Sequence, residues 1–211
     1  MRTVADPVKF STIAARTSTH GIQRELLRKS IHMLIALVPF GAAIVGVEIM
    51  LYLLGIGVVV YTYAETQRLR GNSIPIVSRI TSMASREREF GHFVLGPVSL
   101  GIGAMLALLL YPYPAAVVAI YALAFGDGFS SIVGKMFGKI QIPGTGGKTI
   151  AGSMACFIAI LIVSFAATHS LNSAVLIAAA GTFLEALPTK DFDNILLPMG
   201  VGFITQLLMI V

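Results

Sequence analysis

Two carboxylates lie within long apolar segments of the 211-residue chain, at Asp127 and Glu185. A charge inside a membrane-spanning segment costs about 2.5–3.5 kcal/mol on insertion scales, so such residues usually serve a function. The alternative interpretation is that each carboxylate lies near a helix end and pairs with a loop lysine. Both possibilities require an apolar helix to carry the acid, and both make these two positions the first candidates for chemistry.

The residues that follow Asp127 predict a helix with one small, polar face. Asp127, Ser130, Gly134 and Gly138 recur at intervals of three or four residues, which places them on the same side of a helix. Glycines on such a face allow close approach of a ligand. They equally allow close approach of another backbone, and small-residue helix packing is the alternative explanation.

A glycine-rich stretch at 143–149 ends immediately before the next apolar segment. A flexible loop, Lys148, the Thr149 hydroxyl and a helix N-terminus together favour phosphate binding. The loop is not a Walker A motif, because that motif would need glycine where Ile142 stands and a preceding strand. With Lys135 and Lys139 close by in the sequence, the stretch indicates a polyphosphate site.

Three further polar clusters flank the apolar segments. Glu25, Arg28, Lys29 and His32 are spaced for one face of a helix. Glu65 and Arg68 close the second segment, and Arg86-Glu-Arg-Glu89 opens the third. Glu185, Asp191, Asp193 and Asn194 gather between the last two segments, and carboxylate oxygens of this kind suit Mg²⁺. An interfacial histidine, a solvated charge run and a solvated acidic loop are the corresponding alternatives.

Composition identifies the elements that must position these residues. The chain is 56% hydrophobic and 12% charged, with a mean hydropathy of +0.86, whereas about a quarter of a typical soluble sequence is charged. We therefore predict an all-α polytopic membrane protein. Basic residues are not interleaved with aromatic ones, which argues against nucleic acid as a partner. The single cysteine, Cys156, excludes a disulfide framework and is expected to be buried.

Seven apolar segments predict about seven transmembrane helices, at roughly 31–46, 48–64, 92–110, 114–134, 150–168, 172–188 and 194–211. All 15 Lys and Arg residues fall in 1–30, 65–91, 135–149 and at Lys190, on one side of such a bundle. The positive-inside rule then places the N-terminus and the active site in the cytoplasm, in a prokaryotic cytoplasmic membrane. We expect a basic interfacial segment at 1–28, which does not resemble a signal peptide, and one transmembrane domain at 29–211 with cytoplasmic loops at 65–91, 135–149 and 189–193.

The motifs, in this order, resemble the family of CTP-dependent lipid-alcohol kinases, which includes dolichol kinase, phytol kinase and the yeast-type diacylglycerol kinase. The resemblance runs from about Glu25 to Pro198. It rests on Glu25-Leu-Leu-Arg-Lys-Ser-Ile-His32, on Glu65-Thr-Gln-Arg68 with Arg86-Glu-Arg-Glu89, on Gly126-Asp127-Gly128 through Lys148-Thr149, and on Glu185-Ala-Leu-Pro188 with Asp193-Asn194 through Pro198. Four positions depart from the family pattern. Thr149 replaces Ser, Ala151 replaces a common Glu, Phe192 replaces the first Asp of D-D-N, and Gly128 stands where Pro is frequent.

The resemblance implies transfer of the γ-phosphate of a nucleoside triphosphate, CTP in this family, to the hydroxyl of a polyprenol, a phytol-like alcohol or diacylglycerol. It implies catalytic roles for Asp127, Lys148 and Asp193, and Mg²⁺ at Asp127, Glu185 and Asp193, with Asp127 as an alternative proton acceptor. The expected nucleotide site comprises Ser130, Gly134, Lys135, Gly138, Lys139, Lys148, Thr149, Gly152, Ser153 and Asn194. The expected lipid site comprises Glu25, Arg28, Lys29, His32, Glu65 and Arg68.

Other functions stay open from the sequence. A phosphatidate cytidylyltransferase would use similar nucleotide and metal groups but would release pyrophosphate. A small transporter is less consistent, because the two halves show no matched pair of broken helices. A scaffold without catalysis would not need buried acids beside a Gly-Lys-Thr loop. The expected partners are the lipid alcohol and the nucleotide within a membrane, with a homodimer left open.

Overall fold

The computed structural model describes residues 21–72, 74, 79–81, 83, 85, 89, 91–189 and 192–210. Most of the predicted interfacial segment 1–28 therefore lies outside the described residues, as do Arg86, Glu87, Arg88 and Asp191. The part of that segment that is described, residues 21–28, is helical and continues directly into the first apolar stretch. It is thus the first part of a long helix.

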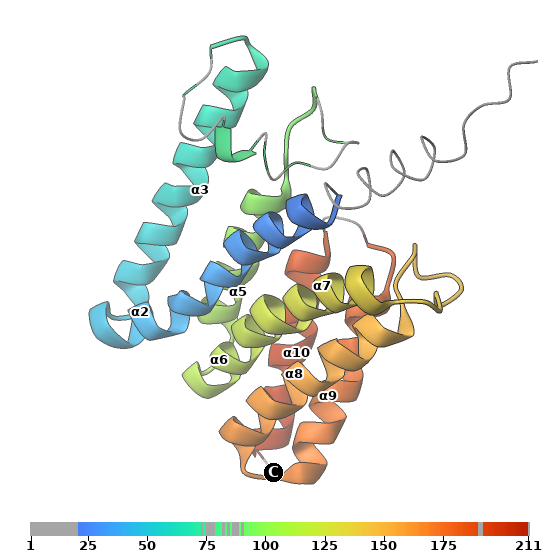
Figure 1. Ribbon diagram of the computed structural model, residues 1–211. Helices are drawn as coiled ribbons and strands as arrows, with labels where there is room; N and C mark the ends of the chain where they lie inside the picture. The colour runs from blue at the N-terminus through green and yellow to red at the C-terminus, as the bar shows by residue number, and fades with distance from the viewer. Residues whose placement is uncertain are drawn as a thin grey trace, which may run out of the picture.

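Seven apolar helical stretches follow one another in the described part of the chain (Figure 1). Their bounds are Gly21–Val45, which contains the 3-10 turn η1 (Leu34–Ala36) and α2 (Leu37–Val45); α3 (Val47–Leu69); α5 (Gly96–Leu110); Tyr113–Phe137, which joins α6 (Tyr113–Tyr121), the π-helical turn η3 (Ala122–Asp127) and α7 (Gly128–Phe137); α8 (Ile150–Thr168); α9 (Leu171–Ala186); and α10 (Asp193–Ile210).

The predicted fold class is confirmed: the described residues form helices without a strand, apart from one isolated bridge between Gln141 and Thr149. Four of the stretches, Gly21–Val45, α3, Tyr113–Phe137 and α8, are long and apolar enough to cross a membrane. Gly96–Leu110, Leu171–Ala186 and Asp193–Met209 are shorter apolar helices. The chain is a polytopic α-helical membrane protein.

The helices extend beyond the apolar segments in two places where a loop was predicted. Residues 65–69 continue α3, and residues 135–137 continue α7. Hydrophobicity marks where a helix leaves the apolar layer, whereas the helix itself continues as long as its backbone hydrogen bonds are made. The predicted loops at 65–91 and 135–149 therefore begin later than expected. This shift puts Glu65 and Arg68 on a helix face.

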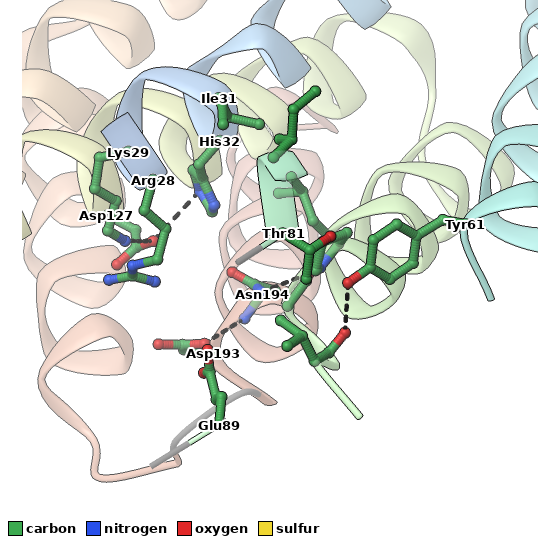
Figure 2. A pocket seen from close by; sticks show the side chains of 15 residues that line it. Arg28, Lys29, Ile31, His32, Tyr61, Thr81, Glu89, Asp127, Asp193 and Asn194 are labelled. Carbon is green, nitrogen blue, oxygen red and sulfur yellow. Dashed lines mark hydrogen bonds and ion pairs between the residues drawn. The ribbon is translucent and has the colours of Figure 1, made fainter. Parts of the chain in front are cut away.

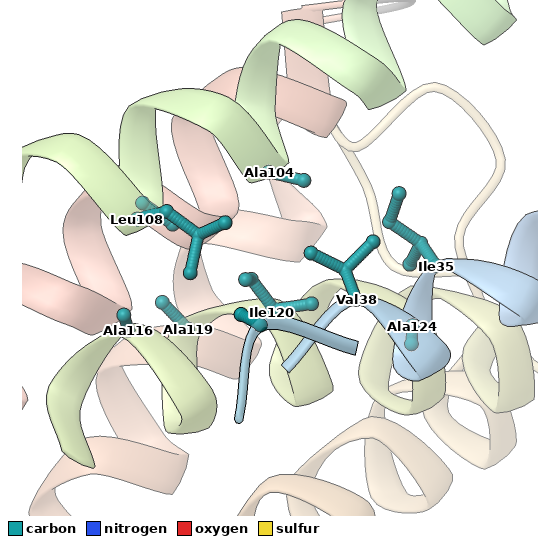
Figure 3. Close-up of a cluster of buried hydrophobic side chains, with 10 residues drawn as sticks. Ile35, Val38, Ala104, Leu108, Ala116, Ala119, Ile120 and Ala124 are labelled. Carbon is teal, nitrogen blue, oxygen red and sulfur yellow. The ribbon is translucent and has the colours of Figure 1, made fainter. Parts of the chain in front are cut away.

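The core surrounds the long helix Tyr113–Phe137. In the most apolar 18-residue stretch of this helix, 61% of the residues are buried. Its alanines at 116, 119 and 124 pack against Ile35 and Val38 of the first stretch and against Ala104, Ala107 and Leu108 of α5, as Figure 3 shows. Small residues let the helix backbones approach closely, which is how helices associate where lipid supplies no hydrophobic driving force. A second cluster joins the same helix to α8, α9 and α10 through Val118, Cys156, Ile160, Ile177 and Val201.

In contrast, α3 lies at the edge of the bundle (Figure 1). Only 6% of the residues in its most apolar 18-residue stretch are buried. The tight turn that joins it to α2 is made at Gly46, whose φ of +91° would be strained for a residue with a side chain. Most of α3 therefore faces lipid, and its contacts are made with α2 and α5.

The central helix predicts a simple packing test. Ala119 is fully buried, so Ala119→Leu should overpack the core and cost about 1–3 kcal/mol. At roughly 2–4 °C for each kcal/mol, the apparent melting temperature in detergent should fall by several degrees. Ala43→Leu makes the same change on the exposed face of α2 and should leave the melting temperature unchanged. Equal melting temperatures for the two variants would contradict this description of the core.

Candidate active site

Asp127 ends the π-helical turn η3, and its side chain is only 3% exposed. Turns of this kind occur mostly within α-helices and frequently at functional sites. Gly128 follows the carboxylate, and a Cβ there would lie 2.5 Å from Cε of Met33. Glycine at this position therefore lets the first helix cross directly over Asp127.

The first helix supplies two partners to the buried carboxylate. Lys29, itself 2% exposed, donates a hydrogen bond from Nζ to Oδ2 of Asp127. His32 Nε2 lies 3.3 Å from the same oxygen and 3.0 Å from the carbonyl oxygen of Leu123 in η3. Figure 2 shows both side chains directed at Asp127. A buried charge needs such a partner, because an unpaired one would pay its full desolvation cost.

Glu185, fully buried on α9, has a different set of partners. Its Oε1 accepts hydrogen bonds from Ser130 Oγ, at 2.7 Å, and from Lys148 Nζ. Although burial acts to lower the pKa of Lys148, the nearby carboxylates of Glu185 and Asp127 outweigh it and raise that pKa above its ordinary value. Lys148 is therefore a permanent cation at neutral pH. The alternative interpretation of Glu185, a carboxylate paired with a loop lysine, describes what the structure contains.

The loop that carries Lys148 folds back on itself before α8. Ile142 N donates to Lys148 O at 2.9 Å, and Ile150 N donates to Ile140 O at 3.0 Å. Thr149 then caps α8, with its Oγ1 accepting from Gly152 N at 3.2 Å. Thr149, which stands where the family has serine, thus caps the N-terminus of α8 through its hydroxyl. This cap fixes the position of the neighbouring Lys148 at the end of the loop.

The glycines of the predicted small face bring α7 and α8 together. A Cβ on Gly152 would lie 2.7 Å from Ser130 O, and one on Gly134 would lie 3.0 Å from Thr149 Oγ1. Gly138 ends α7 in the same contact. Small-residue helix packing, the alternative considered for these glycines, is therefore what the structure shows.

A polar cavity of about 530 Å³ opens beside this loop. Its cations are Arg28, Lys135 and Lys148, and Glu25 accepts hydrogen bonds from Arg28 and, at 2.7 Å, from Lys135. The remaining lining residues are Asp127, Ser130, Ser131, Gly134, Thr145, Gly146, Gly147, Thr149, Leu187, Pro188 and Asp193. The size is in the range of small-molecule sites, and the cations favour an anionic ligand.

A second, apolar cavity of about 280 Å³ also contains Asp127 in its lining, as Figure 2 shows. Its walls come from the first helix, α3, the segment before α5, α5 and α10. They are formed by Ile31, Tyr61, Ile80, Val94, Gly96, Pro97 and Leu100, and its polar groups are Arg28, Lys29, His32, Thr81, Glu89, Asp127, Asp193 and Asn194.

Among the described residues, three line both cavities: Arg28, Asp127 and Asp193. We call this set the junction. Arg28 comes from the first helix, Asp127 from η3 and Asp193 from the start of α10, so three segments far apart in the sequence meet there. A polar ligand and an apolar ligand bound in the two cavities would both reach these side chains.

The predicted nucleotide residues divide between several places. Ser130, Gly134, Lys135, Lys148 and Thr149 line the polar cavity, as predicted residues of one site should. Gly138, Lys139, Gly152 and Ser153 do not line it. Asn194 lines the apolar cavity instead, where its Nδ2 donates to Ser99 Oγ at 2.8 Å.

The predicted lipid residues divide in the same way. Arg28, Lys29 and His32 line the apolar cavity, whereas Glu25 lines the polar one. Glu65 and Arg68 line neither cavity; they form an ion pair with each other. Sequence reasoning missed Tyr61 and Thr81. Nothing in the spacing of an isolated tyrosine within an apolar run, or of a threonine in a loop, marks it as a wall of a cavity.

The described residues form no group of three or more His, Cys, Asp or Glu side chains that could by themselves hold a metal ion. Asp127 and Asp193 nevertheless both line the polar cavity as members of the junction. Mg²⁺ is commonly held by one or two carboxylates together with substrate phosphates. Glu185 lines neither cavity. The donor set thus fits a Mg²⁺ ion that arrives with a phosphate ligand.

Comparison with known proteins finds phytol kinases. The chain is 28% identical to "Probable phytol kinase, chloroplastic" of Triticum aestivum over 147 residues, which cover 61% of this chain and 49% of the relative. It is 24% identical to "Phytol kinase 1, chloroplastic" of Arabidopsis thaliana over 149 residues, 62% of this chain and 49% of the relative. The chain thus spans about half the length of the curated relatives it matches.

A scan against protein-family models finds no match, and no solved structure matches significantly. The curated relatives are nonetheless named for one activity, and the chain aligns with them over more than half of its own length. The resemblance to the lipid-alcohol kinases, predicted from four motifs in order, is therefore confirmed through this similarity to the phytol kinases.

Proposed function

We propose that this protein is a membrane lipid kinase that transfers the γ-phosphate of a nucleoside triphosphate, CTP by family resemblance, to the hydroxyl of a phytol-like alcohol, a polyprenol or diacylglycerol. One observation carries the proposal. A cation-lined cavity and an apolar cavity meet at Arg28, Asp127 and Asp193. Phosphoryl transfer between a nucleotide and a lipid requires two sites of opposite character whose reacting ends touch. The similarity to phytol kinases supports the same reaction class.

In this proposal the triphosphate lies in the polar cavity. Lys148, Lys135 and Arg28 come from a loop and two helices and would surround it with positive charge. Glu25 accepts from Arg28 and Lys135, and Glu185 accepts from Lys148, so phosphate oxygens would take over contacts that these carboxylates make. Positioning and charge neutralisation supply most of the catalysis in phosphoryl transfer. A site of paired cations matches that requirement.

The alcohol would enter the apolar cavity with its hydroxyl at the junction. The hydroxyl oxygen forms the new bond to the γ-phosphorus, the bond from that phosphorus to the bridging oxygen breaks, and the nucleoside diphosphate leaves. The hydroxyl proton would pass to water as the new bond forms, and Asp127 is the alternative acceptor in place of its role as a Mg²⁺ ligand. Lys29 and His32 both contact Oδ2 of Asp127, which fixes the orientation of this carboxylate toward the reactants.

Mg²⁺ would be held by Asp127 and Asp193 together with phosphate oxygens, and it would neutralise the charge that develops on the transferred group. Glu185, which was predicted as a third ligand, is better assigned to orienting Lys148, because its Oε1 accepts from that ammonium. We further propose that the junction faces the cytoplasm. The one-sided distribution of Lys and Arg supports this orientation.

Two lysines of the predicted phosphate site should behave differently. Lys148→Met removes a cation from the polar cavity, so kcat/KM should fall by about 10²-fold or more. Lys139→Met removes the same charge from an exposed position outside both cavities, and kcat/KM should stay within about twofold. Both are measured with purified protein, and size-exclusion profiles confirm folding. Equal losses in the two variants would refute the assignment of Lys148 to the phosphate site.

The reaction itself is tested by its products. With CTP, Mg²⁺ and a panel of phytol, polyprenols and diacylglycerol, label from the γ-phosphate should appear in the lipid. Label from the α-phosphate should not appear there, and no pyrophosphate should form. Incorporation of α-label with phosphatidic acid as acceptor would instead identify a cytidylyltransferase. Absence of both transfers across the panel would reject the proposed function.

A further inference from the structure

Residues 92–95, immediately before α5, form an irregular segment that lies against the end of α3; we call it the strap. Its backbone is held by three side chains of α3. Val94 N donates to Glu65 Oε1 at 2.9 Å, Tyr61 OH donates to Val94 O at 3.0 Å, and Arg68 Nη2 donates to His92 O at 3.0 Å. Tyr61, Glu65 and Arg68 are spaced by four and three residues and so share one helix face.

These contacts give the backbone of the strap the hydrogen-bond partners that a regular helix or sheet would otherwise provide. Backbone buried away from water must pair its N–H and C=O groups, and Val94 is buried. No strand is present among the described residues. Side chains of α3 take both polar groups of Val94 instead, so the position of the strap depends on the positions of those side chains.

Glu65 can act in this way because Arg68 neutralises it. The carboxylate is fully buried, and its two oxygens accept from Arg68 Nε at 2.8 Å and from Arg68 Nη2 at 2.7 Å. A bidentate pair of this kind is strong and fixes the geometry of both side chains. Without Arg68, Glu65 would be a buried carboxylate without a charge partner, and it would no longer be a rigid acceptor for Val94 N.

The strap forms part of the wall of the apolar cavity. Val94 and Tyr61 line that cavity, and Gly96 and Pro97, directly after the strap, line it too. The rings of Tyr61 and Phe93 meet edge to face, with centroids 6.5 Å apart. Glu65 and Arg68 line neither cavity, so they stand one layer behind this wall.

We infer that Glu65 and Arg68 are positioning residues for the lipid half of the reaction: they set the shape of the apolar cavity through the strap and thereby the choice of alcohol, without touching lipid or nucleotide. This inference rests on the proposed function, since it assigns the apolar cavity to the alcohol. It replaces the prediction that both residues bind the lipid directly. No residue of the strap lines the polar cavity, so nucleotide binding there should not depend on Glu65 and Arg68.

The test compares two arginines at the end of α3. Arg68→Met releases the strap and should raise the KM for the alcohol by about tenfold while the KM for the nucleotide stays within about twofold. It should also reduce the discrimination between long branched and short linear alcohols. Arg70→Met removes the same charge from an exposed position on the same helix end, and it should change neither KM nor the discrimination.

A conservative series protects the test against misfolding. Arg68→Lys keeps a cation beside Glu65 but lacks the bidentate fork, and Glu65→Gln keeps an acceptor for Val94 N but loses the charge. Both should raise the alcohol KM less than Arg68→Met does. A parallel rise of both KM values in the Arg68 and Glu65 variants, no rise in either, or the same effect in Arg70→Met would overturn the inference.

A binding measurement separates this inference from the proposed function. A ligand that binds the folded state raises its melting temperature. Added alcohol should raise the melting temperature of the wild type and of Arg70→Met, and it should raise that of Arg68→Met much less at the same concentration. If the wild type transfers no phosphate, the proposed function fails while this comparison still decides the role of the strap. An equal rise in all three proteins would overturn that role.

Discussion

The contact on which the site depends is the buried ion pair between Lys29 and Asp127. A carboxylate inside an apolar helix must be paired, and within this bundle the first helix supplies the cation. That requirement fixes where the first helix crosses the central one. Gly128 follows the carboxylate at this crossing, where a Cβ would lie 2.5 Å from Cε of Met33. The pair thus couples a local electrostatic need to the packing of two membrane helices.

From this crossing the two cavities follow. The first helix separates them, because Arg28 reaches both, Glu25 lines the polar one and His32 lines the apolar one. The start of α10 completes the boundary with Asp193, and α9 holds Lys148 toward the polar side through Glu185. Every cation of the polar cavity is thereby paired with a carboxylate before any ligand arrives. These carboxylates hold the cations at the cavity wall, where an anionic ligand would take their place.

Several features of the fold and site could be predicted from local properties. Hydropathy located the seven apolar helices, since the bilayer requires about 20 apolar residues for each span. The isolated acid Asp127 predicted a candidate site, because a buried charge is costly, and the structure places it in the lining of both cavities. In contrast, the end of α3 was placed too early. A polar helical turn such as 65–69 has no apolar signal, and its stability comes from the strap that it holds.

The sequence by itself thus determined the membrane class and the residue types that line the candidate site, because these follow from composition and from the spacing of residues near one another in the chain. Only the tertiary structure decided which residues meet. The partner of Asp127 stands 98 residues away, and that of Glu185 stands 37 residues away. The same holds for the hydrogen bonds of Glu65 to Val94 and of Asn194 to Ser99, which join residues 29 and 95 positions apart. Such pairings depend on how the helices cross. The crossings are set by packing between segments far apart in the chain, and the local pattern of one segment does not specify which other segment it will contact.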